Sequence, residues 1–335
     1  MSERGLLDLI IARLPGLSFR ERANLCESLD GEKDLALKSK QGIEELIGRR
    51  LAASWDIDLV RMLAERDAHT AQLRGINWVS WQSRAYPPLL REIYDPPAVL
   101  FFKGSLPDSE RPLVAIVGTR KPSPAATAQT FDIAKNLGHS GISVVSGLAL
   151  GIDAMAHRGN IEGGTPTFAI LGSGVDEVYP SSNRALARRV LETGGALISE
   201  YPPGTSPRKW NFPARNRIIS GFCRGVLLVE APEKSGALIT ARFALDQNRE
   251  LWVASVGAEE GQDLRHTADT FDRKGTQRLA EDGAEIVYSA SDILEMWNMK
   301  IPGPRPCRES GGLAAATATA ADVASSLACS LGIKL

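Results

Sequence analysis

The chain has few cysteines, and they lie too far apart to share a zinc ion or to build a disulfide framework. No C-x-x-C pair occurs among the four, which are Cys26, Cys223, Cys307 and Cys329. We therefore expect reduced thiols in a cytoplasmic protein. The first residues do not have the layout of a signal peptide. No apolar run approaches the roughly 18 residues that span a bilayer, so we expect no membrane contact.

Several motifs of nucleotide-binding and hydrolytic enzymes are also missing. The sequence contains no Walker pattern, no G-x-S-x-G elbow and no G-x-G-x-x-G loop. Its histidines and carboxylates show no metal-ligand spacing. We therefore expect no catalytic residue, no metal and no cofactor.

Acidic residues are absent from one stretch of a chain that is otherwise nearly neutral. The net charge is -1 at pH 7, yet residues 201–229 contain five basic residues and no acidic one. Guanidinium groups beside the start of a helix are well suited to hold phosphate oxygens. The stretch therefore predicts a polyanion site. Its basic residues are Arg208, Lys209, Arg215, Arg217 and Arg224.

From residue 113 onward, short apolar runs alternate with helical stretches such as 125–137, 183–192 and 237–247. This alternation predicts an α/β fold with a mostly parallel sheet and helices on both faces. Ligands of such sheets bind at the carboxyl ends of the strands. The expected strands are Leu113–Val117, Ser143–Val145, Thr167–Leu171, Ala196–Ser199, Val226–Glu230, Leu251–Ser255 and Glu285–Tyr288.

The sequence on either side of this pattern divides into three further parts. Residues 1–75 predict a small helical domain, because their apolar clusters keep helical spacing. Its Leu14-Pro15-Gly16-Leu17 turn resembles that of a DNA-binding helical hairpin, although simple helix packing is the favoured interpretation. Residues 76–112 predict a proline-rich connector with a short strand near residues 76–80. Residues 299–335 predict a linker and a tail that buries little.

Small residues follow the predicted strands, where a ligand can approach the backbone closely. Gly118-Thr119-Arg120 ends the first strand, and from this fragment alone Arg120 is either a phosphate or base contact or a solvated loop residue. Ser146-Gly147 ends the second strand and leads to Asp153 and His157, for which a structural role is favoured over catalysis. Aromatic rings beside cations, as at Lys209 to Phe212, suit the stacking of unpaired bases.

Taken together, these segments resemble the DprA/Smf family, the DNA-processing proteins of natural transformation (competence). The similarity covers about two thirds of the chain. It implies an extended Rossmann-like domain over residues 113–298, preceded by a small all-helical, SAM/HhH-like domain. The motifs that carry it are Tyr86-Pro87-Pro88-Leu89-Leu90, Gly118-Thr119-Arg120, Ser146 to Asp153, Glu200-Tyr201-Pro202-Pro203-Gly204, Phe212 to Gly221, Glu230-Ala231, Ser235 to Arg242 and Gly283-Ala284.

The resemblance also implies a function. It predicts that the chain binds single-stranded DNA and loads the RecA recombinase during DNA uptake, without turnover of a substrate. It further predicts a homodimer, with the helix around Lys274–Glu281 as the interface. The predicted DNA-binding residues are Gly118, Thr119, Arg120, Ser146, Gly147, Gly172, Lys209, Phe212, Arg215, Asn216, Arg217, Ser235 and Gly236.

Two departures from the family pattern are visible. Many relatives place a lysine after the tyrosine-proline of the third loop, but here Ser181-Ser182-Asn183 follows Tyr179-Pro180, with Arg184 as a possible substitute. The residues after Pro306 are also fewer than the roughly 60 that a winged-helix module needs, so we expect no complete module of that kind.

Two other functions are compatible with the pattern. A nucleotide-processing phosphoribohydrolase on a related Rossmann-like fold would need a Pro-Gly-Gly-x-Gly-Thr loop with a catalytic glutamate. The chain has no such loop, so Glu200 or Glu230 would have to serve. A nucleotide-sensing module that regulates a partner is the third alternative.

Overall fold

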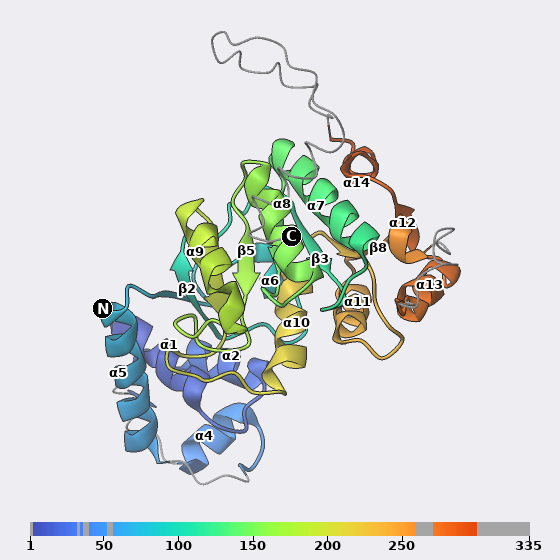
Figure 1. Cartoon of the computed structure of the whole chain (residues 1–335). Helices are drawn as coiled ribbons and strands as arrows, with labels where there is room; N and C mark the ends of the chain where they lie inside the picture. Colours follow the sequence, from blue (N-terminus) through green and yellow to red (C-terminus); the bar gives the residue numbers. More distant parts are fainter. Residues whose placement is uncertain (1–2, 32–33, 36–39, 52–55, 259–270, 300–335) are drawn as a thin grey trace, which may run out of the picture. The chain divides into compact units, whose positions relative to one another are not determined.

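The computed structural model describes residues 3–31, 34–35, 40–51, 56–258 and 271–299. Its centre is a nine-stranded sheet in the order β1-β2-β6-β5-β4-β3-β7-β8-β9 (Figure 1). Seven strands, from β6 to β9 in this order, run parallel to one another, whereas β1 and β2 pair antiparallel. The strands are β1 (Asn77–Ser80), β2 (Val99–Gly104), β3 (Leu113–Val117), β4 (Ser143–Ser146), β5 (Phe168–Ile170), β6 (Ala196–Ser199), β7 (Gly225–Leu228), β8 (Glu250–Ala254) and β9 (Glu285–Val287).

Helices pack on both faces of the sheet, as Figure 1 shows for α7 and α8 in green and α10 in yellow. Alternate side chains of β3 therefore enter two different cores. Val114 and Ile116 pack with residues of α7 and α8, whereas Ala115 and Val117 pack with residues of α10 and α11. The helices that follow β1 are α6 (Pro88–Arg91), α7 (Pro124–His139), α8 (Ile152–Glu162), α9 (Arg184–Glu192), α10 (Asn211–Gly221), α11 (Gly236–Asp246), α12 (Ser255–Ala258), α13 (Lys274–Glu281) and α14 (Ala290–Met296), with a short 3-10 turn, η1 (Ser181–Asn183), before α9.

The described residues before β1 form helices and no strand. Ser18 and Glu21 make a capping box at the start of α2, and Asp56 caps α5. The Gly16 carbonyl accepts a hydrogen bond from the Arg49 guanidinium, and Arg22 binds the carbonyls of Leu14 and Leu17. These bonds support the packing interpretation of the Leu14–Leu17 turn. The helices are α1 (Glu3–Arg13), α2 (Phe19–Ser28), α4 (Lys40–Ile47) and α5 (Ile57–Leu73).

The described residues, from 3 to 299, belong to one compact unit. A separate helical domain over residues 1–75 therefore stays a prediction, as does the 76–112 connector. The predicted linker and tail lie outside the described residues, apart from Met299.

The expected α/β fold is confirmed, and all seven predicted strands from residue 113 onward are present within two residues of their predicted ends. The antiparallel strand β2 was not predicted, because Val99–Gly104 lies beside the prolines of the connector. A second difference concerns α10, which begins at Asn211. Arg215 and Arg217 therefore lie inside the helix, not at its amino end as the sequence suggested.

The order of the strands produces a crevice between β3 and β7. After β3 the chain adds β4, β5 and β6 on one side, and it then returns to place β7 on the other side of β3. The loops that leave the carboxyl ends of β3 and β7 therefore run in opposite directions. This is the topological switch point at which open α/β sheets bind their ligands.

Candidate nucleic-acid interface

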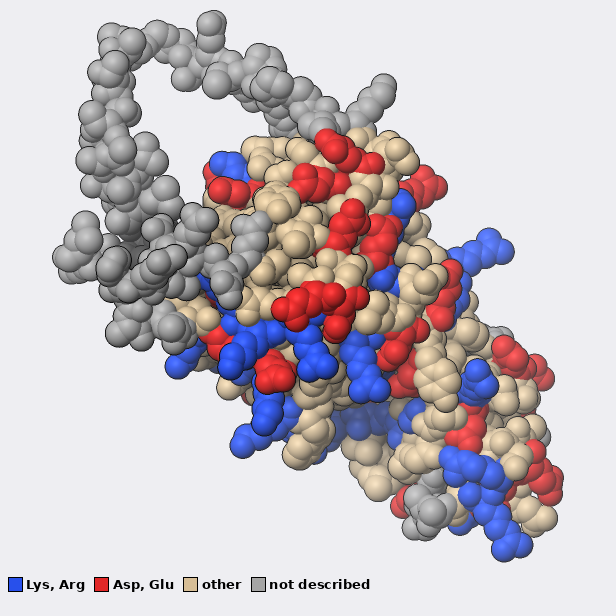
Figure 2. Space-filling model, turned by 90° about the vertical axis from the view of Figure 1, so that its right-hand side faces the viewer, with Lys and Arg blue, Asp and Glu red and all other residues tan. Residues whose placement is uncertain are grey.

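A cleft of about 1150 Å³ opens at this switch point. The loop after β3 forms one wall, the first turns of α10 form another, and the loop between β7 and α11 completes it. Figure 2 shows lysine and arginine side chains gathered in a band across the middle of one face of the molecule. Nine of the thirteen predicted DNA-binding residues line the cleft: Gly118, Thr119, Arg120, Lys209, Phe212, Arg215, Asn216, Ser235 and Gly236.

Four exposed cations of the cleft form no ion pair with any carboxylate that the structure describes. A cleft that concentrates unpaired positive charge attracts a polyanion, even on a protein whose net charge is near zero. Two of the four, Lys121 and Lys234, were not predicted from the sequence. The four are Arg120, Lys121, Lys209 and Lys234.

An aromatic pair lies beside these cations. The rings of Tyr179 and Phe212 are 5.5 Å apart, and the Arg120 guanidinium lies 6.0 Å from the Phe212 ring. Tyr179 is 47% exposed, so its ring is open to a stacking partner. A Cβ at Gly172 would lie 3.0 Å from the Phe212 ring, so the missing side chain gives Phe212 its position. Gly172 thus supports the cleft from below and does not line it.

Arg215 forms the floor of the cleft and is almost completely buried. Its guanidinium donates to the Ile170 carbonyl and lies against Gly147, where any Cβ would overlap with it. Burial lowers the pKa of Arg215 to about 10, while Asp153 acts in the opposite direction. The residue therefore stays cationic at neutral pH. The Asp153 carboxylate compensates this charge from within the protein.

Ser146, at the end of β4, and Gly147, in the glycine-rich loop that follows, were predicted to bind DNA. The structure uses the amides of this loop internally, because the Asp153 carboxylate accepts from Gly147 N at 3.1 Å and from Ala149 N at 3.3 Å. Ser146 is buried, and its hydroxyl donates to Ile116 O at 2.7 Å. Ser146 and Gly147 therefore lie beneath the cleft.

A second buried carboxylate, Glu230, holds the other side of the switch point. It accepts from Arg273 Nε at 2.8 Å and from Ser123 N at 2.7 Å, and its own carbonyl accepts from Thr119 N. The Glu230–Arg273 ion pair joins the loop after β3, the end of β7 and the residues that precede α13. Arg120 and Lys121 extend from the loop that Glu230 anchors.

The loop before α11 is held in a similar way. The Ser235 hydroxyl accepts from Ala237 N and so caps α11. Asn216 Nδ2 donates to Gly236 O at 3.0 Å, which ties α10 to this loop.

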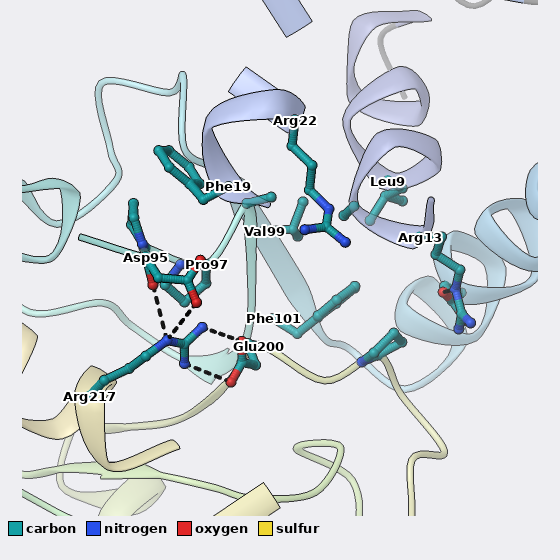
Figure 3. A pocket seen from close by; sticks show the side chains of 15 residues that line it. Leu9, Arg13, Phe19, Arg22, Asp95, Pro97, Val99, Phe101, Glu200 and Arg217 are labelled. Carbon is teal, nitrogen blue, oxygen red and sulfur yellow. Dashed lines mark hydrogen bonds and ion pairs between the residues drawn. The ribbon is translucent and has the colours of Figure 1, made fainter. Parts of the chain in front are cut away.

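Arg217 was predicted to bind DNA together with Arg215, but the structure places it outside the cleft. Residues two apart on a helix point in nearly opposite directions, so Arg217 leaves α10 on the side away from Arg215. It makes two hydrogen bonds to Glu200, at 2.7 and 2.8 Å, and one to the Asp95 carbonyl (Figure 3). Burial alone would lower the pKa of Arg217, but Glu200 outweighs it and the pKa is raised. Arg217 faces a separate cavity of about 210 Å³ that also contains Arg22.

Known proteins resemble the chain over much of its length. A family model described as DNA recombination-mediator protein A matches residues 77–298. The chain belongs to this family. Protein Smf of Synechocystis is 43% identical over 256 residues, which are 75% of this chain and 59% of the relative. The chain therefore spans less than two thirds of that relative.

Two solved structures of the family are similar to the chain. The X-ray structure of DNA processing protein A (DprA) from Streptococcus pneumoniae has a TM-score of 0.67 at 32% identity, over 88% of this chain and 98% of that one. The second structure is DprA from Helicobacter pylori and concerns its single-stranded DNA binding mode. It has a TM-score of 0.56 at 27% identity, over 67% of this chain and 95% of that one. The resemblance to DprA/Smf and the Rossmann-like fold are confirmed.

Two further observations concern the described residues alone. None of their helices combines the length and the apolar character that crossing a membrane requires. They contain no group of three or more histidine, cysteine, aspartate or glutamate side chains that is arranged to hold a metal ion.

Beneath the cleft, His157 is buried, and its interactions predict a pH-dependent stability. Thr167 donates its hydroxyl to Val144 O, so it accepts from His157 Nδ1 at 2.8 Å. Burial, with a smaller effect of Arg215, lowers the pKa of His157 to about 3. Below pH 6.5 the unfolded chain takes up a proton that the folded protein does not. We expect the free energy of unfolding to fall by about 2 kcal/mol from this group between pH 7 and pH 5.

The variant His157→Asn provides the control, because its amide keeps a donor for Thr167 and cannot titrate. Burial raises the pKa of Asp153, which titrates in both proteins and cancels in the comparison. Urea unfolding at pH 7 and pH 5 should show the larger decrease in the wild type. Equal decreases in the two proteins would contradict a buried neutral histidine.

Proposed function

We propose that the chain binds single-stranded DNA in the cleft at the switch point. The observation that carries the proposal is the juxtaposition of four unpaired, exposed cations with the Tyr179–Phe212 pair. Lysine and arginine side chains neutralise the phosphates of a single strand, and aromatic faces stack unpaired bases without sequence preference. The single-stranded DNA binding described for H. pylori DprA supports the same function here.

We assign different roles to the residues of the cleft and to those beneath it. Arg120, Lys121, Lys209 and Lys234 contact phosphates, and Tyr179 and Phe212 stack on bases. Asp153, Glu230 and Arg215 hold the loops that carry them. Because the loop amides after β4 are already bonded to Asp153, side chains and not helix ends supply the contacts.

The double variant Arg120→Ala/Lys209→Ala tests this arrangement. We expect it to bind oligo-dT at least about tenfold more weakly than wild type, with a salt slope smaller by about 1.4, since each phosphate contact on a single strand contributes about 0.7. Fluorescence anisotropy at several salt concentrations measures both quantities. The loss should be similar for oligonucleotides of different sequence.

A matched control removes two cations outside the cleft, in the variant Arg66→Ala/Lys135→Ala. It should bind as the wild type does. Binding that is unaffected in Arg120→Ala/Lys209→Ala, or equally weakened in the control, would show that the cleft is not the DNA site.

We propose that the chain acts on DNA without catalysis. Neither candidate glutamate for a phosphoribohydrolase is available as a base, because Arg217 binds Glu200, and Arg273 and Ser123 N bind Glu230. Incubation with nucleoside monophosphates should release no free base. Release of base that is lost in Glu230→Gln would overturn this conclusion.

We propose further that the DNA-bound chain loads RecA during natural transformation, in the cytoplasm. Membership of a recombination-mediator family supports this role. RecA-dependent ATP hydrolysis on single strands coated with single-strand-binding protein should begin sooner when the chain is added. Arg120→Ala/Lys209→Ala should not shorten the delay, whereas Arg66→Ala/Lys135→Ala should.

The predicted homodimer through α13 stays part of the proposal. Lys274 and Arg278 are exposed on this helix, and Arg278 reaches Glu233 and Asp282 only at 4.0 and 3.9 Å. Sedimentation velocity over a range of protein concentrations should detect a dimer. Arg278→Glu should shift it toward monomer, and a monomer at every concentration would contradict the interface.

A further inference from the structure

A second basic groove, of about 500 Å³, lies beside α9 and outside the cleft. We call it the α9 groove. Its charged lining consists of four cations and one carboxylate, which are Arg74, Lys103, Arg184, Arg188 and Asp176.

Most of the positive charge in the α9 groove is uncompensated. Arg74 forms an ion pair with Asp176. The other three cations, Lys103, Arg184 and Arg188, are exposed and form no ion pair with any described carboxylate. Arg184 and Arg188 are four residues apart on α9, a spacing at which like charges repel. An anion bound in the groove would relieve this repulsion.

One loop separates the α9 groove from the cleft. Val175, Asp176 and Val178 of the β5–η1 loop line the groove, and the next residue, Tyr179, lines the cleft. Consecutive Cα atoms are only about 3.8 Å apart. The two basic surfaces are therefore neighbours across the thickness of a single loop.

The loop itself is firmly attached to its surroundings. The Asp176 carboxylate accepts from Gly204 N at 3.0 Å, and Asn183 Nδ2 donates to Leu148 O at 2.9 Å and to Ala149 O at 3.2 Å. These hydrogen bonds fix the β5–η1 loop between the groove and the cleft. Tyr179 lies on the cleft side of this loop, and Arg184 lies on the groove side.

We propose that the α9 groove continues the path of single-stranded DNA beyond the cleft. A strand whose base stacks near Tyr179 crosses the loop, and its next phosphates meet Arg184, Arg188 and Lys103. This inference rests on the proposed function of the cleft. It predicts that short strands are held by the cleft alone, whereas longer strands also use the groove.

The chemistry of the groove favours a nucleic acid over an acidic peptide. Peptide docking depends on apolar anchors that enter pockets. Most apolar residues of this groove leave little surface for such anchors, since Ile76, Val175 and Leu197 are each 3% exposed or less. Val178 and Leu191 are partly exposed, whereas the three unpaired cations are exposed. Spaced cations above a mostly closed floor suit a chain of phosphates.

The test compares oligo-dT of about 6 nucleotides with oligo-dT of about 20 nucleotides, because single-strand sites range from a few to more than ten nucleotides. The variant Arg184→Ala/Arg188→Ala should bind the long strand about tenfold more weakly, with a salt slope smaller by about 1.4. Its affinity for the short strand should equal that of wild type. Unchanged short-strand binding also shows that the variant is folded.

The matched control is Arg158→Ala/Arg189→Ala, which removes the same charge from α8 and from another face of α9 without touching the groove lining. It should bind both strands as the wild type does. The inference is overturned if the groove variant binds the long strand normally, if it loses the short strand equally, or if the control is weakened as much. A wild-type protein that binds neither strand would instead overturn the proposed function of the cleft as well.

Discussion

Two buried carboxylates, Asp153 and Glu230, organise the carboxyl edge of the sheet. Each accepts hydrogen bonds from loop amides, and each lies close to a buried arginine, Arg215 or Arg273. An amide left unpaired in such a place would cost free energy, so the loops can stay close to the sheet only because these oxygens satisfy them. The buried charges then neutralise each other within the fold.

The exposed charge of the cleft is a consequence of this arrangement. Because Asp153 and Glu230 are engaged below the surface, they do not compensate the cations above them. Arg120, Lys121, Lys209 and Lys234 remain unpaired among the described residues, although the whole chain carries nearly equal numbers of acidic and basic residues. A focused electrostatic site thus exists on a protein with almost no net charge.

Helix α10 places side chains in two separate environments. Phe212, Arg215 and Asn216 face the cleft, whereas Arg217 binds Glu200 and Asp95 beside the helices of the first 73 residues. The motif that looked like one cluster of cations is therefore divided between residues that face the cleft and a residue with a structural role. Gly147 and Gly172 allow this arrangement, because the absence of their side chains leaves room for Arg215 and Phe212.

The amino-acid sequence by itself determined the parallel α/β architecture, the strands from β3 to β9 and the family. Periodicity and apolar runs are local properties, and motifs such as Gly118-Thr119-Arg120 can be recognised without a structure. It also indicated nine residues that line the cleft. The strand β2 was not predicted because it lies within a proline-rich connector, where the local signal for a strand is weak.

Only the tertiary structure decided which cations are free. Arg215 and Arg217 are two residues apart and chemically identical, yet one is buried under Gly147 and the other is bound to Glu200, which lies 17 residues away. Lys121, Lys234 and Tyr179 join the cleft through the position of β7 beside β3 and through the loop after β5. Pairing between charges depends on distances across the fold, and no local pattern in the chain specifies them.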